Sequence, residues 1–128
     1  KNSRNTAWLR RGYDEAVKNG KLSALTGFEH YVRVAEQVEA KLVGVTTSDG
    51  VVIRGYVTHF LDRIIGSYAE RREPVEIEDI LDALTNPAEI RSRGGSDRTY
   101  IHKRYICKVG VNPTIRMLVQ VTPRKRGN

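Results

Sequence analysis

The chain has 128 residues, of which 39% are hydrophobic and 29% charged, and its formal net charge is +7. This length suits one domain with a modest core. The sequence contains neither an apolar run of membrane-spanning length nor a signal-peptide pattern. It does not begin with methionine, so we expect a fragment of something larger, and one with no membrane-spanning segment.

Cysteine and histidine are too sparse to build a metal centre. The lone Cys107 excludes an internal disulfide and any cysteine-rich metal site. His30, His59 and His102 are far apart in sequence and show no metal-ligand spacing. We therefore expect no metal and no cofactor.

The positive charge is concentrated in the last third of the chain. Residues 1–87 carry 12 basic and 13 acidic side chains, whereas residues 88–128 carry 10 basic and 2 acidic ones. Such polarity favours a polyanionic partner, with nucleic acid first and an acidic protein second. The alternative is that this end is merely well solvated.

The apolar spacing predicts helices first and strands afterwards. Helices are expected over residues 5–18, 28–41, 58–68 and 76–84, the third capped by Thr58. A short hairpin is expected from 42–46 and 51–54 around the turn at 48–50, followed later by strands at 88–93, 98–103, 104–111 and 115–122. This order predicts an α+β fold, with helices packed on one face of a roughly four-stranded antiparallel sheet.

The predicted helix at 58–68 places a histidine and an arginine on its polar side. At about 100° per residue, His59 and Arg63 lie one turn apart and opposite an apolar stripe. That stripe consists of Phe60, Leu61, Ile64, Ile65 and Tyr68. Because the pair does not fill the core, it is a candidate for a phosphate contact beside a proton-transfer group.

Period-2 alternation predicts one apolar and one polar face for the sheet. The apolar face is expected to carry Met117, Val119 and Val121, together with Tyr105, Cys107, Val109 and Val111. The other face is expected to display Arg104, Lys108, Gln120 and Thr122. A register slip of one residue would exchange the two faces.

Three segments occur in an order that resembles a known group of nucleases. They are 56–66 with its His59-x-x-x-Arg63 pair, 75–87, and 109–113 through 118–123. Together they resemble the barnase–EndoU–colicin–RelE superfamily, especially the domains at the C-termini of polymorphic and contact-dependent growth inhibition toxins. The resemblance covers about residues 50–123. One departure is Thr114-Ile115-Arg116 after the Asn-Pro turn, where relatives commonly have glycine.

The resemblance implies a metal-independent ribonuclease whose active site lies on the exposed sheet face. His59 and Arg63 match the family's polar helix positions, and Thr99 and Thr122 match its strand hydroxyls. It also implies division into an N-terminal helical extension or linker (1–45), a nuclease domain (46–123) and a basic tail (124–128). The implied context is the C-terminal part of a larger secreted or cell-surface bacterial protein, a monomeric toxin acting in the target-cell cytoplasm. An acidic cognate immunity protein would neutralise it, and tRNA would be its foremost substrate.

RNA cleavage by its own 2′-hydroxyl needs a proton acceptor, a proton donor and cations around the phosphate. We expect His59 to be the general acid or base and Arg63 to hold the phosphate. Thr99 and Thr122 would hydrogen-bond the phosphate oxygens or the ribose. The expected RNA-binding residues are Lys103, Arg104, Lys108, Tyr100 and Gln120.

Several interpretations stay open at this point. His102 is an alternative second catalytic residue, and Tyr105 either stacks on a base or packs in the core. A non-catalytic nucleic-acid-binding module is the alternative to a nuclease, and a protein-interaction domain is a third possibility.

Overall fold

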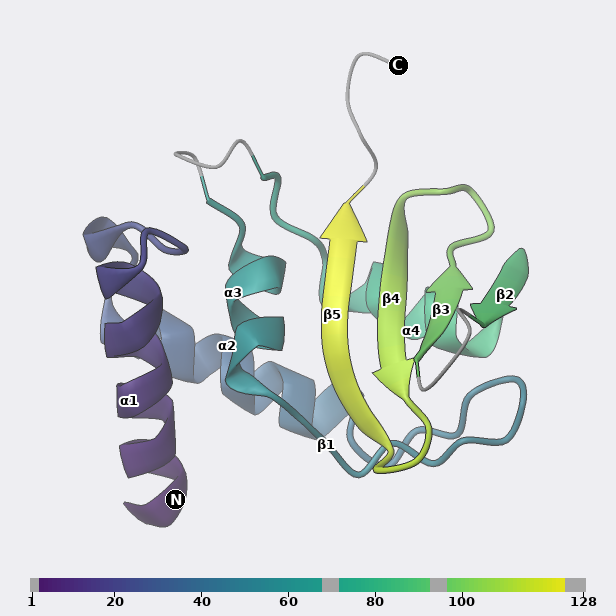
Figure 1. The fold of residues 1–128 in the computed structure, drawn as a ribbon, viewed down its shortest axis with the longest axis horizontal. Helices are drawn as coiled ribbons and strands as arrows, with labels where there is room; N and C mark the ends of the chain where they lie inside the picture. The colour runs from purple at the N-terminus through teal and green to yellow at the C-terminus, as the bar shows by residue number, and fades with distance from the viewer. Residues whose placement is uncertain (1–2, 68–71, 93–96, 124–128) are drawn as a thin grey trace.

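The computed structural model describes residues 3–67, 72–92 and 97–123 (Figure 1). Its helices are α1 (Ser3–Lys18), the short 3-10 helix η1 (Ala24–Thr26), α2 (Phe28–Lys41), α3 (Thr58–Ile65) and α4 (Ile77–Thr85). Its strands are β1 (Gly55–Tyr56), β2 (Glu89–Ser92), β3 (Arg98–Ile101), β4 (Cys107–Asn112) and β5 (Met117–Pro123). None of these helices is long and apolar enough to cross a membrane.

The strands form one open sheet in the order β1-β5-β4-β3-β2. The α+β prediction is confirmed, but the sheet has a fifth strand and is mixed, because β1 pairs with β5 in parallel. The expected hairpin around 48–50 is present as an irregular antiparallel pairing, with a bridge between Thr46 and Val52 and a backbone bond from the Ile53 N–H to the Val45 carbonyl at 2.9 Å, but its arms are too short and irregular to form strands. Beyond it the chain stays extended and runs along β5, where the Val57 N–H donates to the Leu118 carbonyl at 3.1 Å.

Helices cover one face of the sheet and continue past its β5 side. In Figure 1, α4 lies behind the sheet, where it packs on β3 and β4, while α3 lies beside β5. α1 and α2 pack in turn on α3. Leu9 of α1 and Tyr31 of α2 belong to the same buried cluster as Phe60 and Leu118. Residues 1–45 therefore contribute to the core of the remainder of the chain.

The helix containing His59 is shorter than the sequence predicts. It ends at Ile65 because Gly66 adopts φ 79°, a conformation that glycine tolerates and that commonly terminates helices. The predicted Thr58 cap is wrong, since the extended residue Val57 precedes the helix and Thr58 is already helical. Tyr68, assigned to the apolar stripe, falls outside the described residues.

The hairpin between β3 and β4 departs from the predicted strands. β3 ends at Ile101 and β4 begins only at Cys107. In the intervening turn Tyr105 takes φ 60° and is 57% exposed, while its N–H donates to the His102 carbonyl at 2.7 Å. The expectation that Tyr105 belongs to the apolar face is therefore wrong, because the turn removes it from the alternation.

A β-bulge changes which residues of β5 point toward the core. Gly110 pairs with Gln120 but Val111 pairs with Leu118, so Val119 is an extra residue on β5. Leu118 and Val121 are consequently fully buried, whereas Met117 and Val119 are only half-buried. The expected core placement of Met117 and Val119 is therefore wrong, while that of Val121 holds.

Candidate functional site

The uncovered side of α3 holds the predicted histidine–arginine pair. α1, α2 and β5 pack on the other sides of this helix. The His59 side chain is 42% exposed, and the Arg63 Nε–H donates to His59 Nε2 at 3.0 Å. Because Nε2 accepts this bond, a neutral imidazole carries its proton on Nδ1. The sequence thus placed the two side chains together correctly.

Asp62 adds a carboxylate that the sequence interpretation did not select. Its Oδ2 lies 3.7 Å from His59 Nδ1, and the residue is only 5% exposed. Burial raises the pKa of Asp62 to about 7, against the opposing influence of the Tyr31 hydroxyl and of the Arg63 and Lys21 charges. A carboxyl group that titrates near neutrality beside a histidine is characteristic of functional sites.

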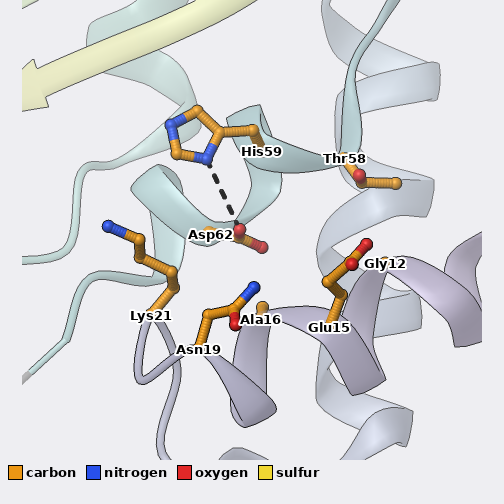
Figure 2. Close-up of a pocket in the computed structure, with 8 residues that line it drawn as sticks. All are labelled: Gly12, Glu15, Ala16, Asn19, Lys21, Thr58, His59 and Asp62. Atoms are coloured by element: carbon orange, nitrogen blue, oxygen red, sulfur yellow. Dashed lines mark ion pairs between the residues drawn. The ribbon is translucent and has the colours of Figure 1, made fainter.

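His59 and Asp62 adjoin a hollow of about 260 Å³ between α1 and α3, whereas Arg63 does not line it. Figure 2 shows Asp62 beneath the imidazole of His59, with Glu15 on α1 and Asn19 just after the end of that helix. The hollow is lined by Gly12, Glu15, Ala16, Asn19, Lys21, Thr58, His59 and Asp62. Its polar lining suits a polar ligand or an ordered water better than an apolar one.

Gly12 determines how closely α1 approaches this site. A Cβ atom at position 12 would lie 2.7 Å from the Thr58 side chain and 2.9 Å from the Tyr31 hydroxyl. Only glycine lets the two helices come this close without displacement. The burial of Asp62 thus depends on a residue distant in sequence, although a glycine within an otherwise helical pattern is a signal of close packing.

The uncovered face of the sheet carries the predicted polar residues. Lys108 pairs with Thr122, and Gly110 lies between Thr99 and Gln120 in the cross-strand register. Directly paired residues share a face, so Thr99, Lys108, Gln120 and Thr122 lie on one side of the sheet. The Gln120 amide donates to the Thr122 hydroxyl at 3.3 Å, and the cluster faces away from the helices.

α3 begins directly after a backbone bond from Val57 to Leu118 of β5, and α3 lies beside that strand (Figure 1). From the bond between Val57 and Leu118, a helix advances about 1.5 Å per residue and a strand about 3.3 Å. Arg63 therefore lies about 9 Å along α3, and Gln120 about 7 Å along β5. By this estimate, the turn of α3 that carries Arg63 has advanced about as far as the part of β5 that carries Gln120.

Two predicted RNA-binding residues lie elsewhere. Tyr100 is fully buried and its hydroxyl donates to Asp49 at 2.7 Å, so the expectation that it contacts RNA is wrong. The side chain of Tyr100 lies on the covered face of β3. Lys103 lies 3.4 Å from Asp82 of α4, while Arg104 is exposed in the same turn.

His102 is fully buried, and of its two ring nitrogens only Nδ1 has a hydrogen-bond partner among the described residues. Its Nδ1 accepts the backbone N–H of Arg104 at 3.0 Å, and its Nε2 faces Asp82 and Asp79 at 3.6 and 3.8 Å. A side chain without exposed surface cannot contact a substrate in this conformation. The structure therefore favours a role for His102 in joining the β3–β4 turn to α4.

Comparison with models of protein families, with curated proteins and with solved structures finds no match for the chain. The described residues contain no cluster of three or more histidine, cysteine, aspartate or glutamate side chains that could hold a metal ion. A functional assignment thus depends on the chemistry of the side chains around α3 and on the uncovered sheet face.

Proposed function

We propose that this chain is a metal-independent endoribonuclease that cleaves RNA through attack of its 2′-hydroxyl. The observation that carries this proposal is the half-exposed imidazole of His59, whose Nε2 is held by Arg63 on the uncovered side of α3. Proton transfer and phosphate binding are the two requirements of this reaction, and histidine and arginine are well suited to them.

In this proposal Arg63 is displaced from His59 by the substrate. A phosphate accepts charge-assisted, bidentate hydrogen bonds from a guanidinium, which are stronger than the bond to a neutral imidazole. Binding of the phosphate therefore frees Nε2, which becomes available as a general base. The arginine in turn stabilises the negative charge that develops on the phosphate oxygens.

The proposed reaction then proceeds without a metal. His59 Nε2 takes the proton of the 2′-hydroxyl as its oxygen forms a bond to phosphorus. The bond from phosphorus to the 5′-oxygen breaks, and that oxygen takes a proton from water. The products are a 2′,3′-cyclic phosphate and a 5′-hydroxyl end.

The uncovered sheet face is proposed to bind the RNA strand. Lys108 and Arg104 contribute charge, while Thr99, Thr122 and Gln120 offer hydrogen bonds to phosphate or ribose oxygens. The proposal includes a path for the RNA from the sheet to α3 past β5, on which α3 packs. Single-stranded RNA, with accessible phosphates and bases, suits such a surface.

The biological setting is proposed from the family resemblance. The chain would be a toxin domain of a larger secreted or cell-surface bacterial protein, used in competition between bacteria. It would act on RNA, foremost tRNA, in the cytoplasm of the target cell. Because residues 88–128 are strongly basic, an immunity protein that covers them would be acidic.

Incubation of the purified chain with total tRNA in EDTA tests the proposed activity. Discrete fragments with cyclic-phosphate ends are expected, and their absence under a range of salt concentrations would refute the nuclease. Salt-sensitive retention of RNA without cleavage would instead favour a binding module, the second candidate suggested by the basic C-terminal third. Growth arrest on expression without an inhibitor, relieved by a co-expressed acidic partner, tests the toxin role.

A further inference from the structure

The burial of Asp62 lowers the stability of the folded state. Its Oδ1 is buried and finds no hydrogen-bond partner among the described residues. Burying a carboxylate without complete hydrogen bonding destabilises the folded state. An uncompensated polar atom of this kind calls for a functional explanation.

The other carboxylate oxygen indicates what that function is. Asp62 Oδ2 faces Nδ1 of His59, while Arg63 occupies Nε2 on the opposite side of the ring. An acceptor beside Nδ1 favours the tautomer with its proton there and leaves the Nε2 lone pair for a substrate. Asp62 itself has too little exposed surface to reach RNA.

We propose that Asp62 is the positioning residue of the nuclease, fixing the tautomer and the orientation of His59 from beneath the imidazole. This inference rests on the proposed function for its consequence in catalysis. It depends for its structural part only on the geometry of α1 and α3.

The surroundings hold the carboxylate in place. The titratable and charged groups around it are Glu15 of α1, Lys21, Tyr31 of α2, and His59 and Arg63 of α3. Burial, with the nearby Asp62 charge, raises the pKa of Tyr31, so its hydroxyl stays protonated and can donate to the carboxylate. Gly12 lets α1 come close to Thr58 and the Tyr31 hydroxyl, and α1 lines the hollow beside the carboxylate with Gly12, Glu15 and Ala16.

Asp62→Asn, which keeps the shape and removes the charge, tests the proposal together with Asp62→Ala. Both variants are expected to lose about 10- to 100-fold in kcat, the cost typical of removing a supporting group, with little change in KM. Because the Arg63 bond to Nε2 also favours the Nδ1–H tautomer, ¹⁵N NMR spectra are compared in an Arg63→Ala background. There, adding Asp62→Ala should change the neutral His59 ring from the Nδ1–H tautomer to a mixture. Asp82→Asn is the matched control, since Asp82 faces the buried His102 and should affect neither measurement.

The NMR measurement separates this proposal from the nuclease assignment. If adding Asp62→Ala to Arg63→Ala leaves the His59 tautomer unchanged, the positioning role is overturned, whatever the activity. A changed tautomer, together with a wild-type chain that cleaves no RNA, would support the positioning role and overturn the proposed function. Wild-type kcat in both folded Asp62 variants would also overturn the positioning role in catalysis.

Discussion

Two histidines in this chain face aspartates of a neighbouring or shared helix, yet their situations are opposite. His59 is 42% exposed and lies 3.7 Å from Asp62 on α3. His102 is fully buried and lies 3.6 Å from Asp82 on α4. In the first pair the histidine meets solvent and the aspartate is buried. In the second the histidine is buried and the aspartate is partly exposed.

Burial therefore distinguishes a histidine suited to proton transfer from a histidine suited to a structural role, although the residue type is the same. An exposed imidazole supported by a buried carboxylate can exchange protons with a bound molecule. A buried imidazole that accepts a hydrogen bond at Nδ1 and faces aspartates with Nε2 instead lies between two parts of the fold, here the β3–β4 turn and α4. The experiments below test whether the two pairs differ in this way.

The largest effect is expected on activity from His59→Ala. Loss of a proton-transfer group lowers the cleavage rate by about 10²- to 10⁴-fold, while the free energy of unfolding should change by about 0.5 kcal/mol or less because the side chain is half-exposed. Rates on a defined RNA and urea unfolding measure both quantities. His30→Ala, at an exposed position of α2, is the control, and full cleavage by His59→Ala would exclude this histidine from the mechanism.

The next effect concerns the pH dependence of stability at Asp62. Its pKa is raised from 3.8 to about 7 in the folded chain, so between these values the folded state holds a proton that the unfolded state has released. The contribution of this group is therefore complete below about pH 4 and is lost as the pH rises through 7. Relative to Asp62→Asn, the wild type should lose up to about 4 kcal/mol over this interval.

Urea midpoints of the two proteins between pH 4 and 8 measure this difference. Subtracting one curve from the other removes the titration of the groups that both share. A difference that stays constant with pH would contradict the raised pKa of Asp62.

The variant His102→Ala should lower the stability of the fold but leave the activity of the site on α3 unchanged. Removing this fully buried ring creates a cavity and leaves the Arg104 N–H without its acceptor. We expect a cost of about 2 to 4 kcal/mol in unfolding free energy, measured by urea titration. The activity of the folded fraction should equal that of the wild type, and loss of catalysis in a folded variant would restore His102 as a catalytic candidate.

The smallest effect is expected at Tyr105, whose φ of 60° is unfavourable for a side chain with a Cβ. Tyr105→Gly should stabilise the fold by about 1 kcal/mol. If the exposed ring stacks on a base, the same change should weaken RNA binding by about 1 to 3 kcal/mol. Arg116→Gly, at φ 59° in the β4–β5 turn, is the matched control for the backbone effect, and undiminished RNA affinity in Tyr105→Gly would exclude stacking.

The parts of the fold that follow local periodicity were predictable from the sequence. α4 lies within one residue of its expected bounds, and His59 and Arg63 lie opposite the buried Phe60 and Leu61 as the helical spacing predicts. Alternation likewise placed Lys108 on the uncovered face. In these elements the local pattern and the tertiary packing agree.

The remaining features depend on contacts that a local pattern does not contain. Val119 becomes an extra residue because its neighbours Leu118 and Gln120 pair with the consecutive residues Val111 and Gly110 of β4. β1 forms because β5 offers a free edge. Asp62 lies at a polar position of the α3 pattern but is buried because α1 approaches at Gly12. The acidic member of the candidate site was therefore missed, although its two neighbours on the helix were found.

The bond from Val57 to Leu118 joins the start of α3 directly to β5. Only one helical residue separates this attachment from His59, so the imidazole moves with the sheet and not as part of an independent lid. The loss of conformational freedom needed to align it occurs during folding, before any substrate arrives. If the chain binds RNA as proposed, binding would require rearrangement chiefly of the Arg63 side chain, and the imidazole would already be in place.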